Sequence, residues 1–542
     1  MKTRSLFVAL LFALACLFFS CKDEVSLEGN IYVGDIDGHP YAVFLESMLV
    51  EDDDILLSGH YLDISSSRAD SVAFKLKTNK KSLYIEAALP SGKDEFLTRN
   101  KLLNRNLKLS SFDSDGFTAD GKISLGLFVQ KMPFHFELYR QQPFVSYANT
   151  RYRKPCYRVD AVSDICYGKA RGYWDEVAFE DDNTIDLLLK LRETDEQRDL
   201  DLCMDIYTPQ DDVLEHRPLI MLIHGGAFYK GTKINPKYVR WGEYFSSLGY
   251  VVASINYRLG FRVNLESIER TAYRALQDAH AAMRFLVEKR DVYGIDTSMI
   301  FVAGSSAGAI TALNLAYMSD QFRPASSYAI PDDDLPDLGS VAGSGNAYHH
   351  HFDIKGVVNM WGAISDIAML DHRSVPILSF HGDKDDIVPY NYDYPFKMVG
   401  SVKRVLFNKM YGSYPIQQRA EANHIPAELH TFKGWKHDPY IDKNDSINSN
   451  YFLIQGKMEN FFRQVMVPQE PLIIASKSAE GVYSLLADKL QEISWEAEGG
   501  FIIGQEGNSV GVVWMNNAPR RVLRASGKLA YDYGFISSKK LK

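Results

Sequence analysis

The sequence has few cysteines and no surplus of basic residues. Five of its 542 residues are cysteine, so a dense disulfide framework is excluded as the basis of the fold. Lys and Arg number 60 against 69 Asp and Glu, which gives a net charge of -9. Binding to nucleic-acid phosphates needs clustered cations, so this balance argues against a nucleic-acid partner. Internal repeats and low-complexity tracts are also missing.

Long apolar runs are scarce, and the one at the N-terminus has the features of an export signal. A basic start precedes the run from Leu6 to Phe19, which is too short to span a bilayer comfortably. The following Cys21 resembles the lipidated cysteine of bacterial lipoproteins, although Phe18 fits the usual aliphatic position poorly. We therefore expect residues 1–20 to be a signal peptide and Cys21 to anchor the exported protein to the outer membrane, with exposure at the cell surface as a further expectation. The alternative is an ordinary cleaved signal with an incidental cysteine.

The chain is long enough for several domains and contains ample apolar material, at 46% hydrophobic residues. From residue 22 to about residue 150, short strand-like runs alternate with polar turns, which predicts a β-rich sandwich or barrel-like domain. Residues 160–466 alternate apolar runs with helix-length segments, which predicts a mostly parallel sheet with helices on both faces. Residues 467–542 contain strand-like runs again and are expected to form a small β-rich extension. No chemistry is evident in either β-rich part.

The remaining cysteines leave the disulfide pairing open. Cys156 and Cys166 are close enough in the sequence to close a short loop in an exported protein. Cys203 lies inside a strand-like run, where we expect a small core residue. Connectivity cannot be deduced from sequence, so the Cys156–Cys166 pair is a hypothesis only.

The central chemical motif is Gly304-Ser305-Ser306-Ala307-Gly308. It follows an apolar strand and precedes a helix, the setting that a nucleophile elbow requires. Small flanking residues allow a turn so tight that the serine hydroxyl projects from the sheet edge. The motif is short and common, and its alternative interpretation is a structural turn. The strand-turn-helix context favours Ser306 as a nucleophile.

A second motif, His224-Gly225-Gly226-Ala227-Phe228, directly follows the apolar run Leu219 to Ile223. Glycines in such a loop bring backbone N–H groups close to a substrate carbonyl oxygen. We predict an oxyanion hole made by the amides of Gly226, Ala227 and Ala307. Alanine at position 227 replaces a usual third glycine, and its amide still donates if the backbone angle is ordinary.

Two later loops supply a candidate acid and a candidate base. His381-Gly382-Asp383-Lys384-Asp385-Asp386 follows a predicted strand, and a carboxylate there could orient an imidazole. Three aspartates compete for this role on the residues alone. Gly434-Trp435-Lys436-His437 follows the last strand of the predicted sheet, a better position for a general base than His424 or His430. The order of serine, aspartate and histidine is the one expected of an α/β-hydrolase.

Together these motifs make residues 165 to 465 resemble the α/β-hydrolase esterases, in particular the carboxylesterase-like and hormone-sensitive-lipase-like enzymes. Within this resemblance, loops of the form H-G-x-x-D-x-x-V-P select Asp385, which leaves Asp383 and Asp386 as solvated or turn-capping residues. The resemblance implies an α/β-hydrolase fold and a triad of Ser306, His437 and Asp385. It also implies hydrolysis of carboxylic esters through an acyl-enzyme, with no metal and no cofactor.

The substrate is less defined than the reaction. We expect a small-molecule ester or an esterified glycan, which an anchored protein with a β-rich domain could meet at the cell surface. The insertion from Asp320 to Asp353 is predicted to form a lid or pocket wall. Phe228, Trp361 and Trp435 could line a pocket or belong to the core. His349-His350-His351 is interpreted as a loop, not a metal site.

Two other functions were weighed. A serine peptidase of the prolyl-oligopeptidase type also joins a β domain to this catalytic fold, but its propeller needs far more than the roughly 120 residues between the predicted signal and the catalytic region. A non-catalytic esterase-like binding protein usually lacks a triad member, whereas every role has a candidate in this chain.

Overall fold

The computed structural model describes a subset of the chain that includes nearly all of the predicted catalytic region. The described residues are 31–36, 39–51, 54–63, 72–79, 82–86, 108–113, 116–124, 131–140, 144–146, 151–176, 197–330, 335–442, 446–467, 471–487, 489–515, 518–529 and 533–541. Contacts divide the chain into one unit of residues 1–148, 470–530 and 534–542 and a second unit of residues 149–469 and 531–533. Cys21 and the signal region lie outside the described residues, and the domain boundaries given above stay predictions.

The N-terminal part is one antiparallel sheet of eight strands in the order β5-β4-β3-β2-β1-β8-β7-β6. Its strands are β1 (Ile31–Ile36), β2 (His39–Glu51), β3 (Asp54–Asp63), β4 (Val72–Asn79), β5 (Ser82–Glu86), β6 (Lys108–Asp113), β7 (Gly116–Ser124) and β8 (Lys131–Arg140). The first and last strands of the region, β1 and β8, pair with each other. The β-rich prediction is confirmed, and β7 is the strand that the sequence patterns missed.

The C-terminal part consists of two further antiparallel sheets, ordered β20-β21-β24-β23 and β22-β25-β26. Their strands are β20 (Leu472–Ala475), β21 (Val482–Leu486), β22 (Gln491–Glu498), β23 (Gly500–Glu506), β24 (Ser509–Trp514), β25 (Arg521–Lys528) and β26 (Gly534–Leu541). Strands that are neighbours in the chain pair in both sheets, as β25 does with β26, and the more distant pairs β21–β24 and β22–β25 complete them. The predicted β-rich extension is therefore present.

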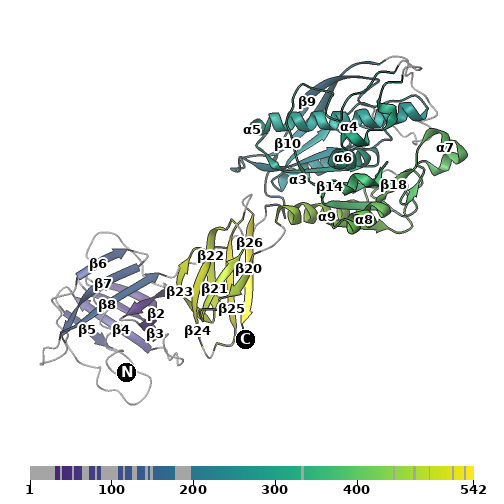
Figure 1. Ribbon diagram of the computed structural model, residues 1–542. Coiled ribbons are helices and arrows are strands. Elements are labelled where there is room, and N and C mark those ends of the chain that lie inside the picture. Colours follow the sequence, from purple (N-terminus) through teal and green to yellow (C-terminus); the bar gives the residue numbers. More distant parts are fainter. Residues whose placement is uncertain are drawn as a thin grey trace. The chain divides into compact units, whose positions relative to one another are not determined.

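The catalytic unit is built on an eight-stranded sheet in the order β19-β16-β14-β13-β11-β12-β10-β9. Figure 1 labels β9, β10 and β14 of this sheet. Its strands are β9 (Val159–Gly172), β10 (Arg198–Pro209), β11 (Arg217–Ile223), β12 (Val251–Ile255), β13 (Ile295–Ser305), β14 (Ile354–Met360), β16 (Ile377–Gly382) and β19 (Ala427–Phe432). The six strands from β12 to β19 run parallel, and only β9 and β10 add antiparallel pairings at one edge. Parallel strands bring their C-terminal ends to one edge of the sheet, where the loops with chemistry begin.

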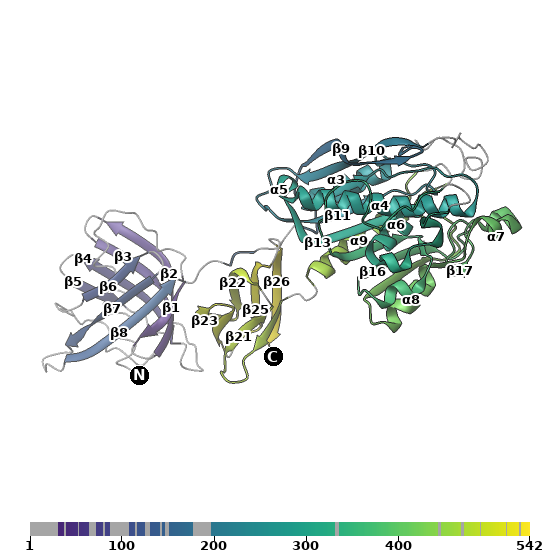
Figure 2. The same cartoon turned by 45° about the horizontal axis from the view of Figure 1, so that its top comes forward.

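Helices cover both faces of this sheet, as Figures 1 and 2 show. They are α3 (Pro236–Ser247), α4 (Leu265–Glu288), α5 (Arg290–Tyr293), α6 (Ala307–Tyr317), α7 (Lys403–Leu406), α8 (Ser413–Ala422) and α9 (Ser449–Met466), with 3-10 turns η2 (Asp320–Phe322), η3 (Ala325–Ser327), η5 (Ile367–Asp371) and η6 (Lys397–Val402). On one face, Leu219 and Met221 of β11 pack into a core with α4 and α6. On the other, Phe301 of β13 packs against Phe462 of α9. The fold is the predicted α/β-hydrolase fold.

A small sheet lies beside the main one, in the order β15-β18-β17. Its strands are β15 (Ala363–Ile364), β17 (Tyr392–Asp393) and β18 (Met410–Gly412). Two of its strands, β17 and β18, belong with η6 and α7 to the long excursion of the chain between β16 and β19, whereas β15 follows β14. No helix or strand is predicted for this excursion from the sequence, and the excursion contributes to the candidate site.

One disulfide links Cys166 of β9 to Cys203 of β10. The antiparallel register places these two residues directly opposite each other. The hypothesis that Cys166 pairs with Cys156 is therefore wrong, and so is the expectation that Cys203 is only a small core residue. Proximity in the chain favoured the first pairing, whereas strand register decides which cysteines meet.

Among the residues that the structure describes, no helix is long and apolar enough to cross a membrane.

Candidate active site

Ser306 occupies a strained turn between β13 and α6. Its backbone has φ 53° and ψ -120°, a conformation that L-residues adopt only where the surrounding structure enforces it. A side chain at Gly308 would place a Cβ 2.0 Å from the carbonyl oxygen of Ile223, so only glycine fits there. The amide of Ser306 donates to the carbonyl of Met360 on β14, at 2.9 Å. The local sequence therefore folds as the elbow that the motif predicts.

Ser306, His437 and Asp385 form one continuous hydrogen-bonded chain. His437 Nε2 lies 2.9 Å from Ser306 Oγ, and His437 Nδ1 lies 2.7 Å from Asp385 Oδ2. The second oxygen of Asp385 accepts the backbone amides of Ile387 and Val388 at 2.8 and 3.0 Å. Three loops from β13, β16 and β19 thus bring together residues that are 131 and 52 positions apart in the chain. This is the arrangement in which an imidazole can take a proton from a serine.

The electrostatics of the pair suit a base and its orienting acid. Burial by itself raises the pKa of the Asp385 carboxyl, but the charge of His437 and hydrogen bonds from His381 and His437 outweigh it and hold that pKa well below its usual range. For His437, burial lowers the pKa, and the neighbouring Asp385 reverses this and raises the pKa above its ordinary value. Asp385 therefore stays ionised, and His437 is a stronger proton acceptor than a free imidazole.

The other candidates for acid and base have different partners. Asp383 accepts the backbone amide of Gly434 at 2.6 Å, and Asp386 forms an exposed ion pair with Lys436 at 2.8 Å. Both therefore tie the acid loop to the loop that carries His437. His430 lies within β19 and packs against Phe432, away from the hydrogen-bonded chain.

The predicted oxyanion loop follows β11 in an unusual backbone conformation. Gly226 has φ 119°, and a Cβ there would lie 2.0 Å from the carbonyl oxygen of Lys230. Ala227 and Phe228 have φ 56° and 58°, so the ordinary backbone angle expected of Ala227 is not found. Left-handed conformations at two such residues cost energy and are typical of functional loops.

A cavity lined mainly by apolar side chains opens beside Ser306. Ala227 and Phe228 of the oxyanion loop line it, as does Ala307 at the start of α6. Its walls continue along α4 and α6. Two of the predicted amide donors, those of Ala227 and Ala307, therefore belong to residues that share this cavity with the serine. Gly226 does not line the cavity and instead shapes the turn that precedes Ala227.

The predicted pocket residues have different positions. Phe228 lines the cavity, whereas Trp361 is fully buried beneath His437, with ring centroids 6.4 Å apart. Trp435 is 43% exposed and does not line the cavity. From the insertion at 320–353, the described residues contribute only Pro324 to the cavity wall. Of the two roles predicted for the insertion, lid or pocket wall, the position of Pro324 supports the pocket wall.

The segment after the acid loop forms the wall that sequence reasoning missed. Phe396, Leu406, Phe407 and Met410 line the cavity together with residues of α4 and α6. Asn408 Nδ2 in this segment donates to Glu269 Oε1 on α4 at 2.7 Å. The available signal was the unusual length of the connection between two sheet strands, which is typical of a binding loop.

The histidine triplet has ordinary local partners. His350 Nε2 lies 2.5 Å from Glu288 Oε2, and His351 Nε2 lies 3.3 Å from Asp353 Oδ1. Within the described parts of the chain, no cluster of three or more His, Cys, Asp or Glu is arranged to hold a metal ion. That the reaction needs no metal or cofactor stays a prediction.

The fold and the site together define an α/β-hydrolase with a serine in the nucleophile position. A family model described as BD-FAE matches residues 204–369, which is less than a third of the chain. The matched segment runs from β10 through the oxyanion loop and the elbow to η5. The segment that carries Ser306 and the predicted oxyanion loop is therefore similar to that family, whereas Asp385 and His437 lie outside the match.

Curated relatives and solved structures give further similarities. The para-nitrobenzyl esterase of Bacillus subtilis is 33% identical over 138 residues, covering 24% of this chain and 28% of the relative. Gut esterase 1 of Caenorhabditis elegans is 29% identical over 130 residues, covering 24% of this chain and 23% of the relative. The chain thus spans about a quarter of the length of these relatives.

Among solved structures, the propionate-bound thermophilic esterase Est2 of Thermogutta terrifontis has a TM-score of 0.35 at 19% identity, covering 50% of this chain and 93% of that one. A truncated carbohydrate esterase from gut microbiota has a TM-score of 0.34 at 17% identity, covering 57% of this chain and 97% of that one.

Proposed function

We propose that the protein is a serine hydrolase of carboxylic esters. The observation that carries the proposal is the hydrogen-bonded chain from Ser306 through His437 to Asp385, with Ser306 on the wall of an apolar cavity. The similarity of residues 204–369 to the BD-FAE family and to named esterases supports the same reaction class. An apolar cavity suits the uncharged groups on either side of an ester bond.

The proposed reaction follows from the proton positions. His437 Nε2 takes the proton of the Ser306 hydroxyl while the serine oxygen attacks the ester carbonyl. Asp385 stabilises the imidazolium that forms, and the amides of Ala227 and Ala307, with that of Gly226, hold the oxyanion. His437 returns the proton to the departing alcohol, which leaves an acyl-enzyme. Water then gives a proton to His437, attacks the acyl group and releases the acid and the free serine.

We extend the proposal to esterified glycans as substrates. The support comes from the setting: the chain has a predicted export signal and two β-rich regions that contain no apparent chemistry, and such regions are a reasonable means of holding a polymer near the site. Release of acetate or of an aromatic acid from an acylated polysaccharide, measured by chromatography, tests this extension. Hydrolysis of small esters without any release from polymers would restrict the function to small-molecule esters.

The reaction is tested with short-chain 4-nitrophenyl esters. We expect the wild type to hydrolyse them and Ser306→Ala to lose roughly a millionfold in kcat, the loss seen when a triad nucleophile is removed. Ser298→Ala is a matched control, because Ser298 is exposed and lies on the same strand away from the elbow. Activity that survives in Ser306→Ala contradicts the mechanism. Cleavage of peptides but not esters would favour a peptidase, and glycan binding without turnover would favour a binding protein.

We further propose that Cys21 carries a lipid anchor that holds the exported protein at the outer membrane. The support is the sequence pattern at residues 1–24. Labelling of expressing bacteria with a palmitate analogue, followed by membrane fractionation, tests it. Cys21→Ser should lose the label and leave the membrane fraction. Retention of both by the variant would leave an ordinary signal peptide as the explanation.

A further inference from the structure

The cavity beside Ser306 runs along one side of α6. The residues of this helix and its caps that line the cavity are Ser306, Ala307, Ile310, Asn314 and Met318, and all of them except Ala307 are spaced four apart. Residues at this spacing lie above one another on a helix, and each residue adds about 1.5 Å along the axis. Asn314 therefore lies about 12 Å from Ser306 along the helix. The cavity has a near end at the nucleophile and a far part that Asn314 and Met318 line.

Most polar side chains on the cavity wall are engaged with the protein itself. Glu269 and Asn408 hydrogen-bond to each other at 2.7 Å. The Tyr273 hydroxyl donates to the carbonyl of Gly339 at 2.8 Å. The ammonium of Lys409 lies 5.3 and 5.5 Å from the centroids of two tyrosine rings. None of these groups needs a ligand to satisfy it.

Asn314 is different. Its side-chain Oδ1 is buried and has no hydrogen-bond partner, although the residue lines the cavity. Its neighbours on the same side of the helix, Ile310 and Met318, are apolar. A buried amide without a partner destabilises a fold, and an apolar residue of similar shape would remove that cost. A residue kept at the expense of stability is typical of a binding site, and a half turn of the amide presents either a donor or an acceptor.

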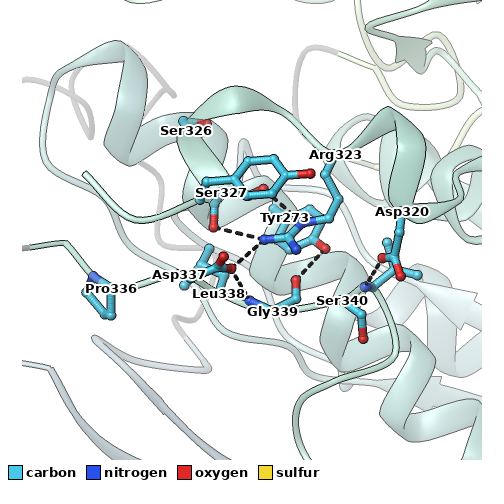
Figure 3. Close-up of polar contacts among 12 residues, drawn as sticks. Tyr273, Asp320, Arg323, Ser326, Ser327, Pro336, Asp337, Leu338, Gly339 and Ser340 are labelled. Carbon is cyan, nitrogen blue, oxygen red and sulfur yellow. Dashed lines mark hydrogen bonds and ion pairs between the residues drawn. The ribbon is translucent and has the colours of Figure 1, made fainter. Parts of the chain in front are cut away.

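The far end of the cavity is held in place by the insertion after α6. Figure 3 shows Arg323 reaching Asp337 and Ser327, and Tyr273 reaching Gly339. The Arg323 guanidinium also stacks on the ring of Tyr273, 5.5 Å from its centroid. Tyr273 lines the cavity, and so does Pro324 from the same insertion. The end wall near Asn314 is therefore braced by an ion pair, hydrogen bonds and a cation–π contact.

From this arrangement we propose that Asn314 is a specificity-determining residue that hydrogen-bonds a polar group at the far end of an elongated, otherwise apolar acyl or alcohol group of the ester. The inference rests on the proposed ester hydrolysis and adds the substrate class. The apolar wall between Ser306 and Asn314 selects the apolar stem, and the amide selects the polar terminus. Sites built to hydrogen-bond a substrate group discriminate strongly against analogues that lack it.

The test compares Asn314→Leu with the wild type on two pairs of esters. One pair varies the acyl group, 4-nitrophenyl hexanoate against 4-nitrophenyl 6-hydroxyhexanoate. The other varies the alcohol, hexyl acetate against 6-hydroxyhexyl acetate. In the pair whose variable group enters the cavity, we expect the leucine variant to lower the kcat/KM ratio of hydroxylated to plain ester about tenfold, the effect of one net hydrogen bond. The pair that responds identifies which side of the ester enters.

Two controls separate this proposal from a structural role. Asn460→Leu makes the same chemical change at an exposed position on α9 and should leave both ratios unchanged. Because leucine removes an unsatisfied amide, Asn314→Leu should also raise the melting temperature. A ratio unchanged in both pairs, together with a lower melting temperature, would overturn the proposal and make Asn314 a structural residue.

The proposal can fail separately from the esterase function. In a Ser306→Ala background the same esters remain intact, so calorimetry measures their binding without turnover. The added Asn314→Leu change should weaken binding of the hydroxylated member about tenfold relative to the plain one. If the wild type hydrolyses none of the esters, the esterase proposal fails, and this binding ratio still decides the role of Asn314. If Asn314→Leu leaves the ratio of hydroxylated to plain ester binding unchanged, the proposed role of Asn314 is wrong.

Discussion

Two regions meet at Ser306, and they differ in whether their polar groups have hydrogen-bond partners. On one side, the polar chain through His437 to Asp385 has its groups partnered: both oxygens of the aspartate and both nitrogens of the imidazole lie within hydrogen-bond distance of other groups. On the other side, the cavity along α6 is apolar and contains an amide whose oxygen has no partner. The chemistry is thus held rigidly by the protein, whereas the far end of the cavity is left for a ligand to complete.

This difference explains how one site can combine a defined reaction with a selectable substrate. A buried polar network is stable only when every member is satisfied, so changes in the polar chain should abolish turnover. The apolar wall is adaptable, because volume-conserving changes there usually cost little. Substitutions on the two sides should therefore differ in kind, with rate lost on one side and preference altered on the other.

After Ser306→Ala, the largest effect on the polar side is expected for Asp385→Asn. An asparagine amide facing His437 Nδ1 favours the wrong imidazole tautomer, and we expect kcat to fall about ten-thousandfold. Turnover needs neutral His437, so activity is absent at low pH and rises as the pH passes the raised pKa of this residue, about 9. Asp385 causes the rise in that pKa, so the variant's residual activity should begin at lower pH. Kinetics from pH 5 to 10 measure both effects.

An unchanged pH profile in Asp385→Asn would show that Asp385 does not control the protonation of His437. Asp386→Asn is the matched control, because this neighbouring carboxylate pairs with Lys436 and raises the pKa of His437 less than Asp385 does. It should retain nearly full activity.

A smaller effect is expected where the two sides join, at the oxyanion loop. In Gly226→Ala the new Cβ would lie 2.0 Å from the Lys230 carbonyl, so the loop must shift and misplace the amide of Ala227. Loss of one oxyanion donor reduces kcat about a hundred- to a thousandfold. Steady-state kinetics measure it, with calorimetric ester binding in the Ser306→Ala background to show that the cavity itself is intact. A normal kcat in Gly226→Ala would show that the amide of Ala227 is not an oxyanion donor.

The smallest effect is expected at the braced end of the cavity, in Tyr273→Phe. The variant loses the hydroxyl that donates to Gly339 while keeping the ring on the cavity wall. We expect the free energy of unfolding to fall by about 1 kcal/mol, measured by urea denaturation, and kcat on short esters to stay within about twofold. A loss of kcat comparable to that of the oxyanion variant would break the distinction between the two sides of the site.

The candidate site was largely predictable because its residues follow strands. Ser306, Asp385 and His437 each stand just after an apolar run, and a parallel sheet gathers such positions at one edge. Local motifs with strict steric requirements, such as the nucleophile elbow, can also be recognised from the sequence. The left-handed conformation of Ala227 was not predictable from the sequence. The loop sequence contains no signal for it, because the surrounding fold imposes this backbone conformation on the alanine.

Other features depended on contacts that sequence order does not reveal. The Cys166–Cys203 bond follows from the register of β9 and β10, and the sequence of neither strand indicates which strand it pairs with. The strand β7 was missed because Gly116–Ser124 mixes polar and small residues, and pairing with β6 and β8 on both sides supplies what its composition lacks.

By itself, the sequence determined the class of fold, the order of the reacting residues and the positions of the loops that carry them, because periodicity and tight turns are local properties. The tertiary structure alone decided which cysteines meet, how the insertion braces the cavity, and that Asn314 faces a ligand space without a partner. Those outcomes depend on the packing of α4, α6 and the segment around Phe396 against one another. Packing is a property of surfaces brought together from distant parts of the chain, and no local pattern encodes it.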